Sequence, residues 1–245
     1  MLKAKLVREK IWEKLRPVAK PDSRFHLNFA EVIPDFEGSD QAIANLLAQP
    51  AYSSGRYAFI TPDNGLVELR RQLLDSGVTL VVSTYGIYRG FYLLDPATIP
   101  EGKTLFASWL DGLEHFGRPI GLAEIADRGR FDFMVTGASA VSTGGVRFGK
   151  GHGFFDLEWG MFTEIGIVDE QTPVGAVVHD VQVVEDILQP SETDILVDDI
   201  ATPTRHLAIK RGIRPRGVKW EMLSPEQIAQ TPPLRELQHM RGLIA

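Results

Sequence analysis

Hydrophobic positions repeat with two different periods that alternate along most of the chain. Apolar residues three or four positions apart predict helices. These segments are 2–16, 41–48, 66–76, 122–127 and 154–167. Short, largely apolar runs between turn residues predict strands or extended pieces. They cover 26–33, 57–60, 78–84, 104–107, 131–136, 174–178, 195–197, 207–210 and 218–222.

The alternation of helices and strands favours an α/β fold. The run Val78–Thr84 is almost entirely apolar, as expected of a strand that is buried on both faces of a parallel sheet. We therefore predict a three-layer open, mostly parallel sheet with helices on both faces. No segment marks an internal boundary, so residues 1–245 are interpreted as one domain. A polar C-terminal extension from about residue 224 is expected to hold short helices.

Composition and charge exclude several classes of protein. The net charge is −6 and the pI is about 5.6, so the surface as a whole is not suited to nucleic acid or to anionic membranes. The sequence lacks an apolar run long enough for a membrane-spanning helix and lacks the apolar core of a signal peptide. We therefore expect a cytoplasmic protein. The absence of cysteine excludes disulfides, thiolate metal sites and a cysteine nucleophile.

A glycine-rich run, Arg-Phe-Gly-Lys-Gly-His-Gly-Phe-Phe-Asp, covers residues 147–156 and leads into the helix predicted over 154–167. Glycine allows a ligand to approach the backbone closely, and N–H groups at a helix N-terminus attract phosphate. Arg147 and Lys150 would add charge-assisted hydrogen bonds, and Asp156 would hold magnesium beside the phosphates. The spacing matches neither the dinucleotide fingerprint nor the Walker motif. The pattern alone leaves a phosphate site and a structural turn as alternatives.

Other chemical patterns are weaker than the glycine-rich run. The segment Gly137–Val141 lacks the second glycine of the G-x-S-x-G hydrolase motif, and the histidines lack zinc-binding spacing. His179 and Asp180 follow the strand predicted over 174–178, at the edge where open α/β sheets bind ligands. They are either an acid–base pair or a hydrogen-bonded polar pair.

Two further groups of residues each allow two interpretations. A cluster of aromatic residues either lines a pocket or belongs to the core, and consists of Tyr85, Tyr88 and Tyr92. The basic stretch Lys210–Lys219 is either a local nucleic-acid patch or a solvated loop. At this net charge a nucleic-acid partner is not expected.

The glycine-rich run resembles the R-L-G-x-G-x-G-Y-Y-D signature of the 5-formyltetrahydrofolate cyclo-ligases, also called methenyltetrahydrofolate synthetases. Pro173–Val184, Asp194–Asp198 and the N-terminal helix around Arg8 are similar to further family segments, so that the resemblance covers most of residues 1–205. It implies an open-sheet α/β fold, ATP and Mg²⁺ as cofactors, and 5-formyltetrahydrofolate as a small-molecule substrate. The implied reaction is phosphoryl transfer to the formyl oxygen, followed by ring closure to 5,10-methenyltetrahydrofolate.

The resemblance also implies roles for individual residues. The phosphates and substrate would be bound by Arg8, Arg147, Gly149, Lys150, Gly151, His152 and Gly153. Magnesium would be held by Asp156 and Asp198. The catalytic positions would be Lys150 and Phe155.

The sequence departs from the family signature at both tyrosines, which are Phe154 and Phe155 here, so that two hydroxyl groups are absent. The segments Ile33–Ser39 and His179–Val184 resemble a divergent branch that includes the methenyltetrahydrofolate synthase domain-containing proteins and is linked to thiamin metabolism. Three functions therefore stay open: the folate cyclo-ligase, an ATP-dependent enzyme with another, thiamin-related substrate, and a non-catalytic nucleotide- or RNA-binding protein. The sequence leaves the oligomeric state undetermined.

Overall fold

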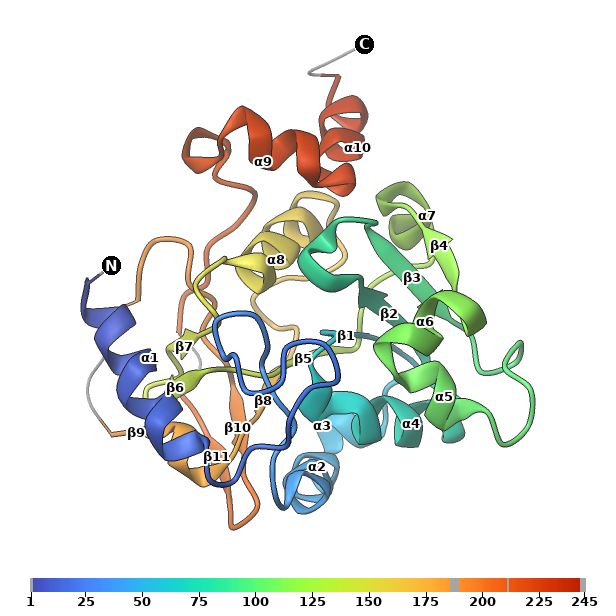
Figure 1. Ribbon diagram of the computed structural model, residues 1–245. Helices are drawn as coiled ribbons and strands as arrows, with labels where there is room; N and C mark the ends of the chain where they lie inside the picture. The colour runs from blue at the N-terminus through green and yellow to red at the C-terminus, as the bar shows by residue number, and fades with distance from the viewer. Residues whose placement is uncertain (1, 186–189, 211, 243–245) are drawn as a thin grey trace.

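The computed structural model describes residues 2–185, 190–210 and 212–242 of the chain. Across these residues an eight-stranded sheet has the order β11-β10-β8-β5-β1-β2-β3-β4 (Figure 1). Its strands are β1 Tyr57–Ile60, β2 Thr79–Ser83, β3 Phe91–Leu94, β4 Arg118–Ile120, β5 Phe133–Thr136, β8 Val174–Val177, β10 Asp199–Ala201 and β11 His206–Ala208. The strands from β10 to β2 run parallel, and β3, β4 and β11 are antiparallel to their neighbours. The predicted mostly parallel α/β sheet is confirmed.

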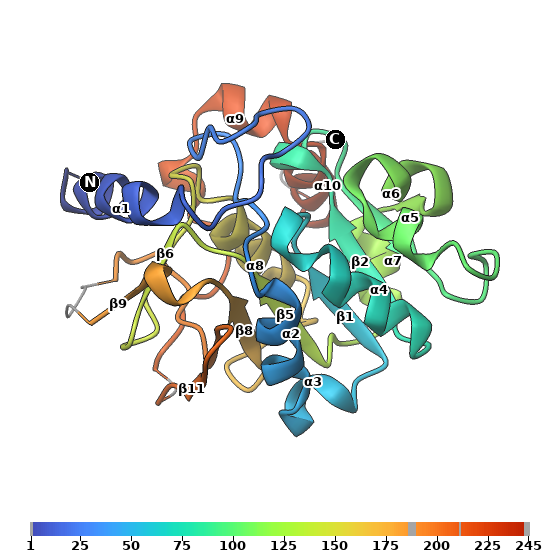
Figure 2. The ribbon, with the colours of Figure 1, turned by 60° about the horizontal axis from the view of Figure 1, so that its bottom comes forward.

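Helices cover both faces of this sheet (Figure 2). One face carries α2 Ser39–Leu47, α3 Pro50–Ser53, α4 Val67–Asp75, α5 Thr104–Ser108 and α6 Leu110–Phe116. The other carries α7 Leu122–Asp127, α8 Phe154–Glu164 and α10 Pro232–Met240, with α9 Pro225–Gln230 beside α10. Because side chains alternate along a strand, Phe133 packs into one core and Met134 into the other. Among the described residues, no helix has the length and hydropathy needed to cross a bilayer.

A small sheet beside the main one directs the chain into the glycine-rich loop. It consists of β6 Ala140–Ser142, β7 Arg147–Phe148 and β9 Val183–Val184, in the order β7-β6-β9. The N-terminal helix α1 Leu2–Leu15 packs against β6 and the 3₁₀ turn Asp180–Gln182. This packing brings the first helix of the chain to the side of the loop.

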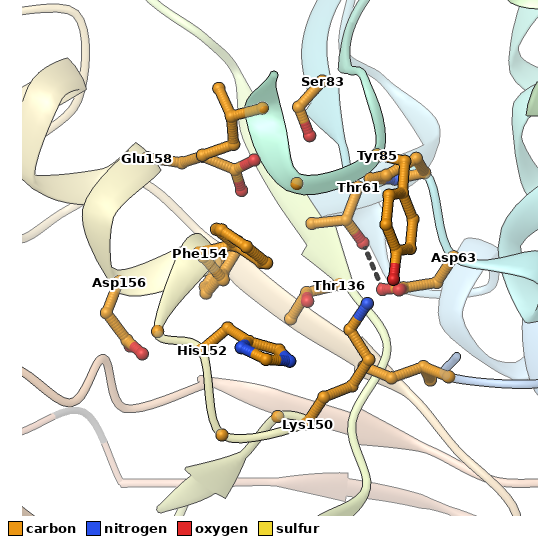
Figure 3. Close-up of a pocket in the computed structure, with 18 of the residues that line it drawn as sticks. Thr61, Asp63, Ser83, Tyr85, Thr136, Lys150, His152, Phe154, Asp156 and Glu158 are labelled. Carbon is orange, nitrogen blue, oxygen red and sulfur yellow. Dashed lines mark hydrogen bonds between the residues drawn. The ribbon is translucent and has the colours of Figure 1, made fainter. Parts of the chain in front are cut away.

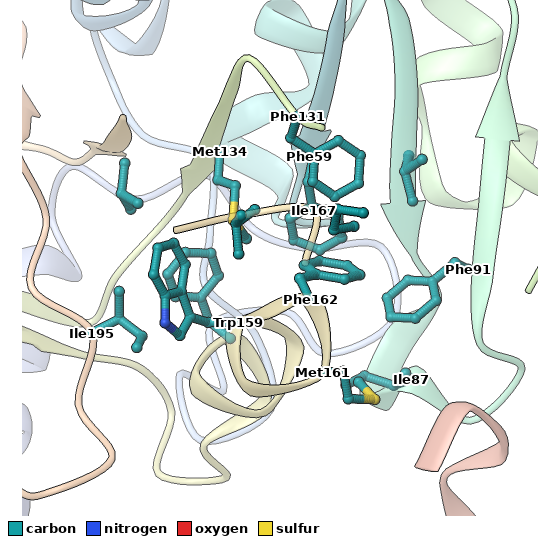
Figure 4. Packing of buried hydrophobic residues seen from close by; sticks show 14 of the residues in the cluster. Phe59, Ile87, Phe91, Phe131, Met134, Trp159, Met161, Phe162, Ile167 and Ile195 are labelled. Carbon is teal, nitrogen blue, oxygen red and sulfur yellow. The ribbon is translucent and has the colours of Figure 1, made fainter. Parts of the chain in front are cut away.

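Four phenylalanine rings fix α8 onto the sheet (Figure 4). The rings of Phe59, Phe91 and Phe131 each lie against Phe162 of α8, with centroid separations between 5.0 and 5.2 Å. Aromatic pairs at such distances stabilise packing beyond the area that they bury. Because α8 follows the glycine-rich loop directly, this cluster also fixes the position of the loop.

The C-terminal segment packs on the same core as α8. Leu234 and Leu237 of α10 are fully buried there, and the Trp159 indole N–H donates a 2.8 Å hydrogen bond to the Pro215 carbonyl. The extension predicted from about residue 224 does contain two short helices. It also buries two leucines at i, i+3 spacing, so its polarity is confined to the outer face.

Two predicted strands are wrong. Residues 26–33 form turns, because the Asp22 carboxylate accepts the backbone N–H groups of Arg24 and Phe25 and closes the chain locally. Residues 104–107 lie in helix α5. The strand prediction failed there because a short apolar run does not distinguish a helix from a strand. The extended piece expected over 195–197 lies before strand β10, which begins at Asp199, and Leu196 forms an isolated antiparallel bridge with Val146. The piece predicted over 218–222 contains the 3₁₀ turn Trp220–Met222.

A buried ion pair ties the C-terminal segment to the edge of the sheet. The Nη2 atom of Arg214 lies 2.5 Å from Oδ2 of Asp198, and both side chains are buried. The same guanidinium donates to the carbonyl groups of Thr172 and Leu196. Arg214 is therefore a structural residue rather than part of a solvated or nucleic-acid-binding surface.

We expect Arg214→Ala to lower the free energy of unfolding by about 3–5 kcal/mol, because it removes the cation that faces a buried carboxylate. Arg216 is the matched control, since it forms an exposed ion pair with Glu170. Arg216→Ala is expected to cost less than about 1 kcal/mol. Urea unfolding of both variants measures the difference, and equal losses would contradict the structural role of Arg214.

Candidate functional site

A cavity of about 440 Å³ opens at the carboxyl ends of β1, β2 and β5 (Figure 3). Strand β1 has β2 on one side and β5 on the other, so the order of the strands reverses there. Such a reversal is where open α/β sheets bind ligands. The cavity wall includes Thr61 and Asp63 after β1, Ser83 at the end of β2 and Thr136 at the end of β5.

The glycine-rich loop forms the facing wall of this cavity. It joins β7 to α8, which begins at Phe154 as the sequence predicts. Gly151 and Gly153 have φ angles of 112° and 69°, a region that other residues seldom adopt. Gly153 is the residue before the first turn of α8, and the positive end of the helix dipole therefore lies at the loop.

Two glycines of the loop make room for guanidinium groups. A Cβ atom added to Gly149 would lie 3.0 Å from Nη1 of Arg147, and one added to Gly151 would lie 3.2 Å from Nη2 of Arg8. The Nε atoms of Arg8 and Arg147 are both buried and have no hydrogen-bond partner in the protein. A buried donor without a partner is costly, and more so when it belongs to a charged group. Both guanidinium groups are thus prepared for an anion.

Lys150 extends across the cavity toward Asp63 and Tyr85 (Figure 3). Its Nζ donates a 2.9 Å hydrogen bond to the Glu31 carbonyl and lies 4.5 Å from the centre of the Tyr85 ring. Burial lowers the pKa of the Lys150 amine, and the nearby Asp63 and Glu31 carboxylates oppose this shift. The amine is therefore held at a fixed place in the cavity.

Tyr85 is the one member of the predicted tyrosine cluster that lines the cavity. Its hydroxyl donates to Oε2 of Glu31 at 2.8 Å, and burial together with this bond raises the pKa of Tyr85 to about 12. Tyr88 is exposed, and Tyr92 packs against the core under α4–α6. Tyr85 therefore fits the pocket-lining interpretation, and Tyr92 fits the core interpretation.

Asp156 lines the cavity and points away from Lys150 (Figure 3). Its Oδ1 accepts the Ile195 N–H at 3.0 Å. Burial raises the pKa of this carboxyl, while the Arg147 guanidinium opposes the shift. Within the described ranges, no group of three or more acidic or histidine side chains is arranged to hold a metal ion.

The expectation that Asp198 holds magnesium with Asp156 is corrected by the structure. Asp198 does not line the cavity, and its Oδ2 accepts bonds from Arg214 and from the Val174 N–H. Of the two predicted metal ligands, only Asp156 lies at the loop.

The aromatic positions of the loop have different surroundings. The His152 ring stacks on Phe154, with the ring centres 5.4 Å apart. Phe155 is buried, and the Arg147 guanidinium lies 4.7 Å from the centre of its ring. Phe155 therefore positions Arg147 and offers no proton for chemistry. The structure brings all the predicted cofactor-binding residues to one cavity, namely Arg8, Arg147, Gly149, Lys150, Gly151, His152 and Gly153.

His179 and Asp180 lie outside this cavity. The His179 Nδ1 accepts the Val181 N–H and caps a 3₁₀ turn, and Asp180 accepts hydrogen bonds from two threonine hydroxyls. Of the two interpretations, the hydrogen-bonded polar pair is the one that the structure supports.

Three acidic residues of the cavity were not singled out from the sequence. Asp63 lies three residues after the strand 57–60, at the ligand-binding edge of the sheet, and its Oδ2 accepts the Thr61 hydroxyl and the Gly137 N–H. Glu31 reaches the cavity from a turn, which only the tertiary structure reveals. Glu158 lies one helical turn after Phe154, a spacing that puts both on one side of α8.

Glu158 is an unusual carboxyl for a cavity wall. Its side chain is 2% exposed, and its buried Oε2 has no hydrogen-bond partner. Burial raises the pKa of Glu158 to about 8, and the Asp63 and Asp156 carboxylates add to that effect. A hydrogen bond with Ser83 and the Arg147 guanidinium lower the pKa in part. Burial therefore favours the protonated form of Glu158 in the folded protein.

Comparison with known proteins assigns the chain to a family. The model of the 5-formyltetrahydrofolate cyclo-ligase family matches residues 2–203. The chain belongs to the 5-formyltetrahydrofolate cyclo-ligase family. The human methenyltetrahydrofolate synthase domain-containing protein is 35% identical over 241 residues, and the zebrafish protein (Danio rerio) of that name is 31% identical over 240 residues. Each alignment covers 95% of this chain but 60% of the relative.

A solved cyclo-ligase structure shares the fold. The NMR structure of 5,10-methenyltetrahydrofolate synthetase from Aquifex aeolicus aligns with a TM-score of 0.53 and 18% sequence identity. The alignment covers 90% of this chain and 99% of that chain. At this identity the likeness concerns the architecture of the sheet and its helices.

The family match ends at residue 203, and the segment that follows it also contributes residues to the site of this cyclo-ligase-family chain. Met222 lines the main cavity, and a smaller cavity of about 200 Å³ beside it is lined by Val218, Met222 and Leu223. The smaller cavity also borders His152 and Phe154 of the loop. The C-terminal segment therefore closes one side of the glycine-rich loop.

We expect Glu158→Gln to flatten the pH dependence of stability. Because the folded pKa of about 8 exceeds the unfolded value of 4.5, the wild-type protein loses stability as the pH rises from about 4.5 to about 8. Glutamine keeps the shape but does not titrate. Thermal unfolding across this window should show the variant gaining on the wild type as the pH rises. Parallel curves would contradict the protonated state of Glu158.

Proposed function

We propose that this protein is an ATP- and magnesium-dependent enzyme that activates an oxygen of a small substrate by phosphoryl transfer and promotes ring closure, with 5-formyltetrahydrofolate as the first candidate substrate. The observation that carries the proposal is the pair of buried Nε–H groups of Arg8 and Arg147 without protein partners at a glycine-rich loop. Phosphate oxygens are strong acceptors for guanidinium donors. The family assignment supports the same chemistry.

The residues of the cavity have distinct roles in this proposal. Arg8, Arg147 and the loop N–H groups at the start of α8 bind the phosphates. Lys150 lies farther along the cavity, next to Asp63, and neutralises charge on the transferred group. Phosphoryl transfer depends mainly on positioning and charge neutralisation, so no protein nucleophile is required.

Asp156 fits a magnesium ion that arrives with a nucleotide. Mg²⁺ is usually held by one or two carboxylates together with phosphate oxygens and water. Asp156 lines the cavity at the first turn of α8, and the described residues offer no cluster that would hold a metal alone. When bound, the metal would supply charge neutralisation at the phosphates. Asp156 would orient it, and Arg147 would counter the remaining charge.

A second candidate function is ATP-dependent activation of a different substrate, such as a thiamin-related amide or formyl compound. It is favoured by Phe154 and Phe155, which stand where the family signature has tyrosines. Phe154 stacks on His152, and Phe155 packs under Arg147, so neither position offers a hydroxyl to a formyl group. Because the chain spans about 60% of its curated relatives, activities of those whole proteins are also proposals for this chain.

We expect Arg147→Lys to weaken binding of a non-hydrolysable ATP analogue with Mg²⁺ by about 10-fold or more, because lysine cannot reproduce the fixed guanidinium donors. Arg118→Lys is the matched control, since Arg118 is exposed and pairs with Glu124 away from the cavity. Isothermal titration calorimetry measures both affinities. Equal affinities, or no binding to the wild type, would contradict the phosphate site.

The substrate assignment is tested by turnover. With ATP, Mg²⁺ and 5-formyltetrahydrofolate, we expect absorbance of the methenyl product to grow in step with phosphate release. ATP-analogue binding without folate turnover would support the second candidate and reject the first.

A further inference from the structure

A single carboxylate at the end of α8 binds three residues from the C-terminal part of the chain. The Oε1 atom of Glu164 accepts the Val218 backbone N–H at 2.8 Å and the Trp220 indole N–H at 3.2 Å. Its Oε2 atom lies 3.0 Å from Nη1 of Arg241. All three partners follow residue 203, where the family match ends. Glu164 therefore fixes the path of a segment that the family model does not include.

A glycine inside α8 makes room for this segment, which passes the helix on its way from β11 to α9 (Figure 1). A Cβ atom added to Gly160 would lie 2.9 Å from the Gly217 carbonyl oxygen and 3.3 Å from the Cα atom of Val218. Glycine weakens a helix interior relative to alanine. The Gly217 N–H also donates a 2.8 Å hydrogen bond to Oγ1 of Thr163. The second half of α8 is therefore suited to close contact with the segment.

The same segment brings one apolar side chain to the ligand site. The 3₁₀ turn Trp220–Met222 begins at a residue that contacts Glu164, and Met222 lines both the main cavity and the smaller cavity. His152 and Phe154 of the glycine-rich loop also line both cavities. Met222 therefore lies where the two cavities and the loop share a boundary.

Met222 is 54% exposed, although it is apolar and lies at a cavity wall. Covering such a surface with a ligand is favourable, and the flexible thioether of methionine adapts to irregular shapes. Met240 of α10 has a comparable exposure of 44% but lines neither cavity. The chain thus contains one exposed methionine at the site and a matched one away from it.

We propose that Glu164 is a positioning residue for the ligand site: through Val218 and Trp220 it holds Met222 in contact with the ligand that is bound at the glycine-rich loop. Met222 touches that ligand beside its phosphates. Glu164 lines neither cavity and acts through the segment alone. Because the ligand at the loop is the magnesium-bound nucleotide of the proposed function, this role of Glu164 rests on that function.

The segment is attached to the core on both sides of its contacts with Glu164. Before them, Arg214 forms the buried ion pair with Asp198. After them, Leu234 and Leu237 are buried in the core beside α8. Loss of the Glu164 contacts should therefore release residues 217–222 while the C-terminal helices stay in place.

The first test measures oxidation of methionine by dilute hydrogen peroxide in the full chain, with sulfoxides located by mass spectrometry of peptides. A non-hydrolysable ATP analogue with Mg²⁺ is expected to slow oxidation of Met222 by about fivefold or more and to change that of Met240 by less than about twofold, because oxidation follows exposure. Unchanged oxidation of Met222 in a wild type that binds the analogue would overturn the inference alone. A wild type that does not bind the analogue would reject the proposed function and the contact with it.

The second test compares variants of the contact. Glu164→Ala removes the acceptor of both N–H groups, and we expect it to abolish protection of Met222 and to weaken binding of the analogue by about fivefold, because the segment is no longer preorganised. Arg241→Ala is the matched control, since it removes the partly exposed ion pair and leaves both bonds to Oε1. Arg241→Ala and Glu164→Gln, which keeps an acceptor oxygen, should retain the protection and bind within about twofold of the wild type.

A purely structural role for Glu164 predicts a different result. In that case Glu164→Ala would lower the thermal unfolding temperature, yet the analogue would still protect Met222 and bind with the affinity of the wild type. Met222→Ala tests the contact independently of how Glu164→Ala folds. It should weaken binding of the analogue by about fivefold with no loss of stability, because it removes an exposed apolar contact, whereas Met240→Ala should change neither. Equal affinities of Met222→Ala and the wild type would overturn the proposal.

Discussion

The site depends on the packing of two guanidinium groups against glycine. Arg8 lies on the first helix and Arg147 on β7, yet both contact the same loop through positions where a Cβ would intrude. The glycines therefore serve two purposes, which are the backbone geometry of the loop and the space for the cations. Because the small sheet holds α1 and the phenylalanine cluster holds α8, the loop is fixed on both sides. The two buried Nε–H donors, which have no protein partner, are therefore interpreted as an anion site rather than as a defect of the fold.

Much of the fold could be predicted from local pattern. The strand 57–60 and the helix 122–127 have the same bounds in the sequence analysis and in the structure, because each has regular apolar spacing between clear turn residues. The strand predicted over 104–107 is a helix in the structure, because a five-residue helix and a short strand have the same apolar pattern. The strand predicted over 26–33 is absent, because the Asp22 carboxylate accepts the backbone N–H groups of Arg24 and Phe25 and closes a turn there.

The candidate site was predicted where it is contiguous in the sequence and, outside that run, at Arg8, which the family resemblance supplied. The glycine-rich run was found, and its members meet in one cavity. The family resemblance places Asp198 in the site. In the structure its carboxylate instead forms a buried ion pair with Arg214, sixteen positions later in the sequence. Glu158 lies four residues after Phe154, and the two therefore share the cavity-facing side of α8. Only the assembled structure shows that its buried Oε2 atom has no hydrogen-bond partner. The likeness to a cyclo-ligase structure thus extends to the scaffold, while the lining of the cavity differs from the family signature at Phe154 and Phe155.

The most direct test of the central claim is a crystal structure of the protein with a non-hydrolysable ATP analogue and Mg²⁺. The account predicts phosphate oxygens within hydrogen-bonding distance of the Nε atoms of Arg8 and Arg147, over the first turn of α8. A nucleotide bound elsewhere, or one that leaves both Nε atoms without partners, would contradict it.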